Sequence, residues 1–471
     1  MNLQEAQLHY PLANTLPPSG GRIEVAPGVK WIRMALPFAL DHINVWLLRD
    51  ELDGVAGWSI VDCCIDAPAS RAQWELLFER ELEGLPVLRV IVTHMHPDHI
   101  GLAHWLCGRW QVGLWVSGTD YYVARNLCAE DTALSGDMSA DFMYAHGWSN
   151  PEDITRIRLR SDFYRSLVPQ LPSTYHRMQD GTLLLIGGRE WRCISGFGHA
   201  PEHLALYCAA SGVLISGDMV LPRISTNVSV YPQEPESDAL ALFLMSIDKF
   251  RALPADTLVL PSHGKPFTGL HTRIDQLQTH HADRLAELQA ACSAAPCSAF
   301  DVLPVLFKRP LDFHQTTFAM GEAIAHLHWL WFTQRVLRTR HPDGVYRFTT
   351  RADAQLEFAA QRRVIRQNGL HRMPKIRAVV HHPQMAEFVH HHIVNHLRAE
   401  LQQPPMQAHR PIRLGTAPTG ARIAQEQAAP AHAELRREMR QTLAKQNQRL
   451  LLHPALRGAL QLRGRGISAQ R

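Results

Sequence analysis

The chain has no uninterrupted apolar run long enough to span a membrane, although 46% of its 471 residues are hydrophobic. A membrane-spanning helix needs about 20 consecutive apolar residues, so the sequence argues against a membrane protein. Residues 1–5 also lack the basic and apolar segments of a secretory signal. The eight cysteines are scattered along the chain, as is typical of reduced thiols. We therefore expect a cytoplasmic protein without a disulfide framework.

A large excess of charge of one sign is also missing, because the formal net charge of the whole chain is only +4. The exception is the segment 351–471, where Lys and Arg outnumber Asp and Glu by about three to one. Its Pro and Gly content predicts partial disorder. The basic side chains could bind RNA or another acidic partner, but aromatic residues placed for stacking on bases are lacking there. A dispensable extension is the favoured interpretation.

The most informative stretch is the segment 91–101, which holds three histidines and a carboxylate within six positions. It follows Leu88–Val92, a run that is apolar apart from Arg89 and rich in branched residues, as expected of a buried strand. Residues 101–106 predict a helix. The polar cluster therefore occupies the loop where a strand ends and a helix begins, which is where open α/β sheets carry their chemistry.

The spacing within this loop predicts a metal site. Side chains two residues apart in extended backbone point the same way, so His94 and His96 can reach one ion together. Pro97 then bends the chain, and Asp98 and His99 project toward a second point nearby. Imidazole and carboxylate are the ligands of a catalytic zinc ion, which keeps one position open for water. A polar loop with scattered histidines is the alternative, but so specific a spacing directly after a buried strand favours the metal site.

This His-x-His-x-Asp-His motif resembles that of the metallo-β-lactamase-fold hydrolases, and the resemblance covers residues 20 to 290. The pattern of that family continues with a lone histidine, an aspartate and a final histidine, each at the end of a strand. His199, Asp218 and His263 occupy these positions, and each follows a strand-like apolar run.

The resemblance implies a dinuclear metal centre. The expected ligands are His94, His96 and His199 for one ion, Asp98, His99 and His263 for the other, and Asp218 as a bridge between them. Zinc is the expected metal, while iron or manganese would suit the same nitrogen and oxygen ligands. The implied reaction uses a hydroxide that bridges the two ions, and Asp98 orients this hydroxide as the catalytic residue.

Two further residues are expected to support the ligands. Asp62 ends an apparent strand, and in the resembled family an aspartate there supports the metal loop; a turn cap is an equally good interpretation of Asp62. His203 lies in the same loop as His199. Because a metal-bound imidazole usually gives its other N–H to an acceptor, His203 is expected behind the ligands or facing the substrate.

The segment 222–232 follows Asp218 directly and is too polar for a core strand. Arg223 and Asn227 are candidates for contact with an anionic or carbonyl substrate, and Tyr231 is a candidate donor to a developing oxyanion. An ordinary solvated loop is the alternative for each of them.

Strand signals joined by glycine-containing turns, with helices before and after, predict an α+β protein, and the resemblance makes this an αββα sandwich over 20–290. Residues 291–350 predict a small helical, winged-helix-like unit, in which Ala319–Arg338 forms a strong helix. The segment 351–471 is the basic extension. His280 and His281 are expected to be exposed on the helix 274–288.

Three classes of function remain open. The complete ligand set favours a metal-dependent hydrolase of a small ester, thioester or lactone, whose partner is a small acyl-type substrate. The winged-helix-like unit and the basic extension favour a lactamase-like endoribonuclease, which salt-sensitive RNA binding would support. A non-catalytic metal-binding or interaction protein is disfavoured by the intact ligand set.

Overall fold

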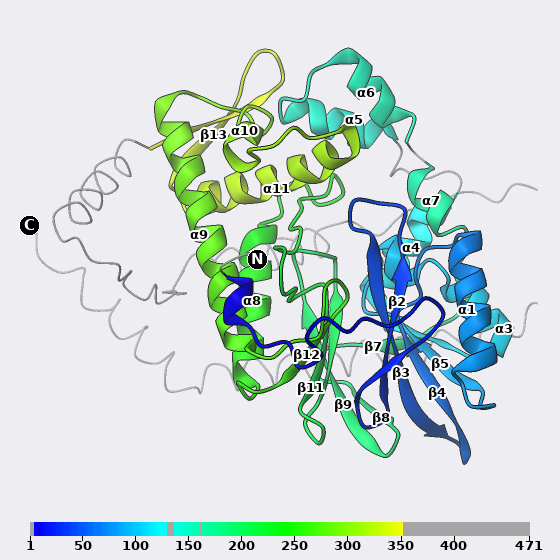
Figure 1. Ribbon diagram of the computed structural model, residues 1–471. Helices are drawn as coiled ribbons and strands as arrows, with labels where there is room; N and C mark the ends of the chain where they lie inside the picture. The colour runs from blue at the N-terminus through cyan, green and yellow to red at the C-terminus, as the bar shows by residue number, and fades with distance from the viewer. Residues whose placement is uncertain (1–3, 130–135, 161, 352–471) are drawn as a thin grey trace, which may run out of the picture. The chain divides into compact units, whose positions relative to one another are not determined.

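The computed structural model describes residues 4–129, 136–160 and 162–351 (Figure 1). Nearly all of the expected basic extension therefore lies outside the described residues. Among the described helices, none is long and apolar enough to cross a membrane.

Two β-sheets and the helices beside them make up most of the described chain (Figure 1). The strands of the seven-stranded sheet, in order, are β1 (Ile23–Ala26), β2 (Val29–Ala35), β3 (His42–Leu52), β4 (Val55–Val61), β5 (Val87–Ile91), β6 (Leu114–Ser117) and β7 (His176–Met178). Those of the five-stranded sheet, in order, are β12 (Leu258–Pro261), β11 (Val213–Gly217), β10 (His203–Cys208), β9 (Arg189–Gly196) and β8 (Leu183–Ile186).

Alternating side chains of the strands fill two different layers of the core. In β3, Trp46 packs against residues of the second sheet, such as Leu206 and Ile215, whereas Val45 and Leu47 point to the opposite face. This alternation follows from the two-residue period of a strand. The two sheets therefore share an apolar interior, and each keeps a second apolar face that helices must cover.

The helices cover those outer faces. The first sheet is covered by α1 (Pro68–Arg80), α3 (Ala103–Trp110) and α4 (Gly118–Cys128). The second sheet is covered by α8 (Ala239–Asp248) and α9 (Leu270–Ala294), and α11 (Phe313–Phe332) packs on these two helices. The expected αββα sandwich is thereby confirmed.

Shorter elements complete the described chain. They are η1 (Glu5–Gln7), α2 (Pro97–Ile100), α5 (Gly136–Ala145), α6 (Pro151–Arg158), α7 (Phe163–Leu167), η2 (Lys249–Ala252), α10 (Leu303–Leu306), β13 (Val336–Arg340) and β14 (Tyr346–Thr350). The last two strands form an antiparallel pair after α11, as the expected unit at 291–350 requires. Since α9 runs across the expected boundary at residue 290, the division into domains stays a prediction.

Two expectations for this region were wrong. The helix expected over Ala319–Arg338 ends at Phe332, because Gln334 adopts a left-handed conformation with φ of 59° and Val336 begins a strand. His281 is buried, not exposed, because the face of α9 that carries it packs on α8 and α11. Its Nδ1 lies 3.0 Å from Nε2 of His326 on α11.

Candidate metal centre

The sheet topology explains why polar residues distant in the sequence meet. Strands β4, β5 and β6 are parallel, so their carboxyl ends lie at one edge of the first sheet. Asp62 follows β4, the loop that begins near His94 follows β5, and Asp120 lies in the helix that follows β6. In the second sheet, β11 and β12 are also parallel, and they end just before Asp218 and His263.

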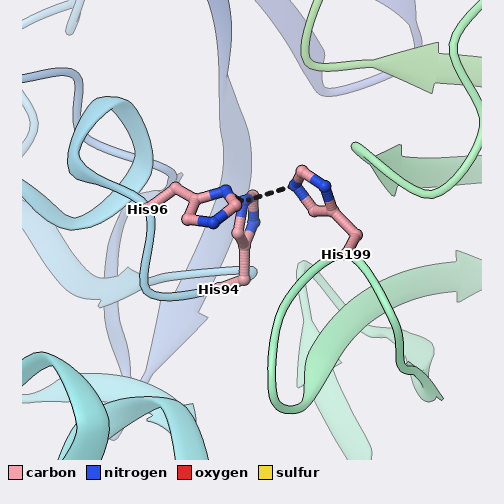
Figure 2. Close-up of side chains that lie close together, drawn as sticks. All are labelled: His94, His96 and His199. Carbon is pink, nitrogen blue, oxygen red and sulfur yellow. Dashed lines mark hydrogen bonds between the residues drawn. The ribbon is translucent and has the colours of Figure 1, made fainter. Parts of the chain in front are cut away.

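The first ligand group consists of His94, His96 and His199 (Figure 2). Nε2 of His94 lies 3.0 Å from Nδ1 of His96 and 3.2 Å from Nε2 of His199. Nitrogens bound tetrahedrally to one zinc ion would be about 3.3 Å apart, given Zn–N bonds of about 2.0–2.1 Å. The three rings are therefore already arranged as ligands of one ion.

The second ligand group consists of Asp98, His99 and His263. Oδ2 of Asp98 lies 3.4 Å from Nε2 of His263 and 3.6 Å from Nε2 of His99. Both imidazoles are buried, and the carboxylate is only partly exposed. This group combines nitrogen and oxygen donors.

Asp218 lies between the two groups. Its Oδ2 is 3.3 Å from Nε2 of His199, while its Oδ1 is 3.7 Å from Nε2 of His99 and 3.5 Å from Nε2 of His263. Asp218 Oδ1 and His99 Nε2 are buried without a hydrogen-bond partner, which is rare for buried polar atoms. A cation at each group would satisfy these atoms, so the donor set fits two divalent ions.

Asp62 supports the second group through two neighbours. Its Oδ2 accepts a hydrogen bond from Nδ1 of His99 at 2.8 Å, and its Oδ1 accepts one from the backbone N–H of Thr93 at 2.8 Å. Because His99 donates through Nδ1, its Nε2 is the nitrogen that faces the group and would bind an ion. Asp62 is fully buried and has φ of 64°, and its support of a metal loop stays a prediction.

Backbone carbonyls orient two other imidazoles in the same way. His199 donates through Nδ1 to the carbonyl oxygen of Asn227 at 2.7 Å, and His263 donates through Nδ1 to that of His42 at 2.7 Å. The side chain of Asn227 was expected to contact substrate. Its Oδ1 instead accepts a hydrogen bond from Ser229, and its backbone is what reaches the centre.

Tyr231 contacts two ligands. Its hydroxyl oxygen lies 3.0 Å from Nε2 of His96, and its O–H donates to the carbonyl oxygen of His199 at 3.1 Å. Since Nδ1 of His96 faces the first group, Nε2 is the protonated nitrogen that donates to Tyr231. The hydroxyl proton of Tyr231 thus already forms a hydrogen bond with the carbonyl oxygen of His199. The expected donation to an oxyanion stays a prediction.

The remaining expected residues lie outside the ligand groups. His203 is buried, and its Nε2 accepts a hydrogen bond from the backbone N–H of Asp218 at 3.1 Å, so it supports the bridging residue. Gly217 leaves room for this ring, because a Cβ there would lie 2.1 Å from Nε2 of His203. Arg223 was expected to contact substrate but is exposed, and its Nε lies 3.9 Å from Oε2 of Glu5. A contact between Arg223 and substrate stays a prediction.

Asp120 is a supporting residue that sequence reasoning missed. Its buried carboxylate accepts hydrogen bonds from the backbone N–H groups of Met95 at 2.8 Å and Glu202 at 2.7 Å. It therefore ties the loop of the first motif to the loop of His199, and burial raises its pKa to about 7. In the sequence, Asp120 looks like an ordinary acidic residue in the first turn of a helix, and nothing nearby marks its partners.

Comparison with known proteins decides the family. The model of the metallo-beta-lactamase superfamily matches residues 39–263, and that of the metallo-beta-lactamase-like C-terminal domain matches residues 285–351. The crystal structure of a beta-lactamase domain protein from Burkholderia ambifaria is 52% identical, with a TM-score of 0.71, and the match covers 74% of this chain and 100% of that one. The chain belongs to the metallo-beta-lactamase superfamily.

Two curated members of the superfamily are also similar. The probable metallo-hydrolase YqjP of Bacillus subtilis is 24% identical over 308 residues, which cover 63% of this chain and 90% of the relative. The linear primary-alkylsulfatase of a Pseudomonas species is 25% identical over 206 residues, which cover 40% of this chain and 36% of that enzyme. The chain thus spans nearly all of the first relative but only about a third of the second.

Proposed function

We propose that this protein is a metal-dependent hydrolase that cleaves a small ester, thioester or lactone with two divalent ions, preferably zinc. The observation that carries the proposal is the position of Asp218, whose two carboxylate oxygens face different ligand groups. When bound, two such ions supply an activated water as nucleophile and withdraw charge from the substrate oxygen. The name of the Bacillus relative, a probable metallo-hydrolase, supports the same reaction class.

The residues of the chain have separate tasks in this proposal. Burial alone would raise the pKa of Asp98, but His99 and His263 hold it below its usual range, so the carboxylate is ionised. An ionised Asp98 can accept a hydrogen bond from the attacking water and orient it. Three imidazoles direct Nε2 toward the centre, because Asp62 and two backbone carbonyls accept hydrogen bonds from their Nδ1 atoms.

The decisive experiment combines metal analysis of the purified full-length chain with a substrate panel. The panel contains a thioester, a lactone, a carboxylic ester, a phosphodiester and RNA, and the alkylsulfatase relative adds a sulfate ester. We expect close to two divalent ions per chain and turnover of at least one acyl substrate, which a chelator abolishes and zinc restores. A chain that binds no metal, or that turns over no member of the panel with metal bound, contradicts the proposal.

The ribonuclease alternative is tested by removing residues 352–471. The basic side chains of that segment are the sequence feature that favours RNA. If the substrate is a small acyl compound, the shortened chain keeps its turnover within about twofold, because the seven candidate ligands all precede residue 264. Salt-sensitive RNA cleavage by the full chain, lost on truncation, would instead assign the protein to the ribonucleases.

A further inference from the structure

Four aromatic side chains from three separate segments form a cluster, which we call the aromatic rim: Phe38, Phe163, His314 and Phe318. The ring of His314 is central. Its centroid lies 6.0 Å from that of Phe38, 5.5 Å from that of Phe163 and 5.0 Å from that of Phe318. Phe38 belongs to the loop between β2 and β3, Phe163 begins α7, and the other two lie in the first turns of α11.

The rim is unusually accessible for a group of phenylalanines. Phe318 is 48% exposed and Phe163 is 36% exposed, although phenylalanine is among the residues most often buried in proteins. Single exposed apolar residues are common, but a cluster that three segments build together is typical of a binding surface. The rim is therefore a candidate surface for binding another molecule.

One hydrogen-bonded path connects the rim to the first ligand group. The carbonyl oxygen of Phe318 accepts a hydrogen bond from the side-chain amide of Asn227 at 3.5 Å. The carbonyl oxygen of Asn227 in turn accepts one from Nδ1 of His199 at 2.7 Å. Phe318 is thus connected to the candidate metal ligand His199 through a single intervening residue, Asn227.

The other two segments of the rim are attached to the metal loops as well. Tyr164, next to the rim residue of α7, donates its O–H to the carbonyl oxygen of Met95 at 2.5 Å, between two ligands of the first group. The loop of Phe38 leads into β3 at His42, whose carbonyl oxygen holds the imidazole of His263. Each of the three segments is therefore connected by hydrogen bonds to a loop that carries candidate ligands.

The imidazole of His314, at the centre of the rim, is neutral. An N–H of Arg160 donates to Nδ1 of His314 at 3.0 Å, which requires the unprotonated nitrogen of a neutral imidazole. Burial and this guanidinium also lower the pKa of His314. The guanidinium carbon of Arg160 lies 4.3 Å from the ring centroid of Phe163, so it adds to the stacked surface.

We propose that the aromatic rim binds the apolar part of the substrate and makes the protein selective for substrates with an aromatic ring or an alkyl chain of several carbons. This inference rests on the proposed hydrolase function, because the reacting bond would lie at the metal centre while the apolar part lies on the rim.

Turnover of a graded series tests the proposal. The zinc-loaded full-length chain is assayed with acetyl, butyryl, hexanoyl and phenylacetyl thioesters of one thiol. In the natural chain kcat/KM should rise with the size of the acyl group. In Phe318→Ala and in Phe163→Ala, kcat/KM for the hexanoyl and phenylacetyl substrates should fall by about tenfold, because each variant loses one ring that would bury the acyl group. For the acetyl substrate, kcat/KM should fall by less than about twofold.

Phe332→Ala is the matched control, because Phe332 lies at the other end of α11 and is 38% exposed. It should leave the whole series unchanged. A flat response of the natural chain to acyl size, or equal losses in the rim variants and the control, overturns the proposal.

Direct binding separates failure of the rim from failure of the proposed function. The affinity of the zinc-loaded chain for 4-phenylbutanoate and for acetate is measured by titration calorimetry, which needs no turnover. About tenfold weaker binding of 4-phenylbutanoate in Phe318→Ala, with acetate unchanged, supports the rim even if no thioester is hydrolysed. If sedimentation instead shows that the natural chain is a dimer and Phe318→Ala is a monomer, the rim is a contact between two copies, and the proposal is wrong.

Discussion

The two ligand groups share Asp218 but differ in charge. The first group offers three imidazoles, and burial together with the neighbouring rings lowers the pKa of His94 and His96, that of His96 to about 3. In the second group burial would also lower the pKa of His99, but Asp62, Asp98 and Asp218 outweigh it and raise this pKa to about 9. His94 and His96 are therefore neutral, whereas the second group attracts positive charge.

This difference suggests that the groups hold their ions in different ways. Neutral imidazoles bind a cation through their lone pairs, whereas a group with carboxylates binds it largely by charge. Nitrogen ligands suit zinc, and mixed nitrogen and oxygen ligands also accept manganese or iron. The comparison predicts that the two ions can be lost separately, unless the shared carboxylate is removed.

Removal of Asp218 should have the largest effect, because it is the residue common to both groups. We expect Asp218→Ala to lose both ions and to lower turnover by more than about a hundredfold. Metal content by mass spectrometry and kcat on the best substrate of the panel are the measurements. Asp256→Ala, which removes an exposed aspartate from a turn, is the control. Retention of both ions in Asp218→Ala would refute the bridging assignment.

Removal of one imidazole from either group should lower the metal content, because only the ion of that group is lost. We expect His96→Ala and His99→Ala each to keep about one of two ions, while turnover falls by about a hundredfold in both. His104→Ala, at an exposed position of α3, should change neither quantity. If either ligand variant loses both ions, the groups bind cooperatively, and the comparison between them fails.

Short-range patterns in the sequence predicted the strands and the positions of the candidate ligands. The two-residue period places His94 and His96 together, and apolar runs before Asp218 and His263 indicate strands that end at the centre. Parallel pairing then gathers the strand ends at one edge. These features depend on neighbours in the sequence, so one sequence is enough to recognise them.

Features that depend on packing between distant segments could not be predicted. Asn227 contacts His199 through its backbone carbonyl, which every residue possesses, so the sequence gives no sign of this contact. The burial of His281 depends on which face of α9 meets α8 and α11, and the apolar pattern of one helix does not show this. Asp120 has an unremarkable position in the sequence and gains its importance only from the two loops it joins.

Loss of the support from Asp62 should weaken the second group selectively. In Asp62→Asn the side chain loses its charge, so the His99 imidazole is held less firmly in its tautomer and orientation. We expect the affinity for the second ion to fall by about 10–100-fold, as is usual for such supporting residues, with the first ion unaffected. Equilibrium dialysis against zinc measures both affinities. Asp66→Asn, which only breaks an exposed ion pair with Arg71, should bind both ions normally.

The smallest effect is expected from Tyr231→Phe, which tests the first group alone. The hydroxyl joins His96 to the backbone of His199, so its loss should weaken binding of the first ion by less than about tenfold and leave kcat nearly unchanged at saturating zinc. An oxyanion donor behaves differently, because its removal lowers kcat by about 100–1,000-fold. Such a loss, with the metal content intact, would show that Tyr231 acts on the substrate and not on the ligands. The zinc dependence of kcat distinguishes the two roles, since added zinc restores activity only when the hydroxyl serves the metal group.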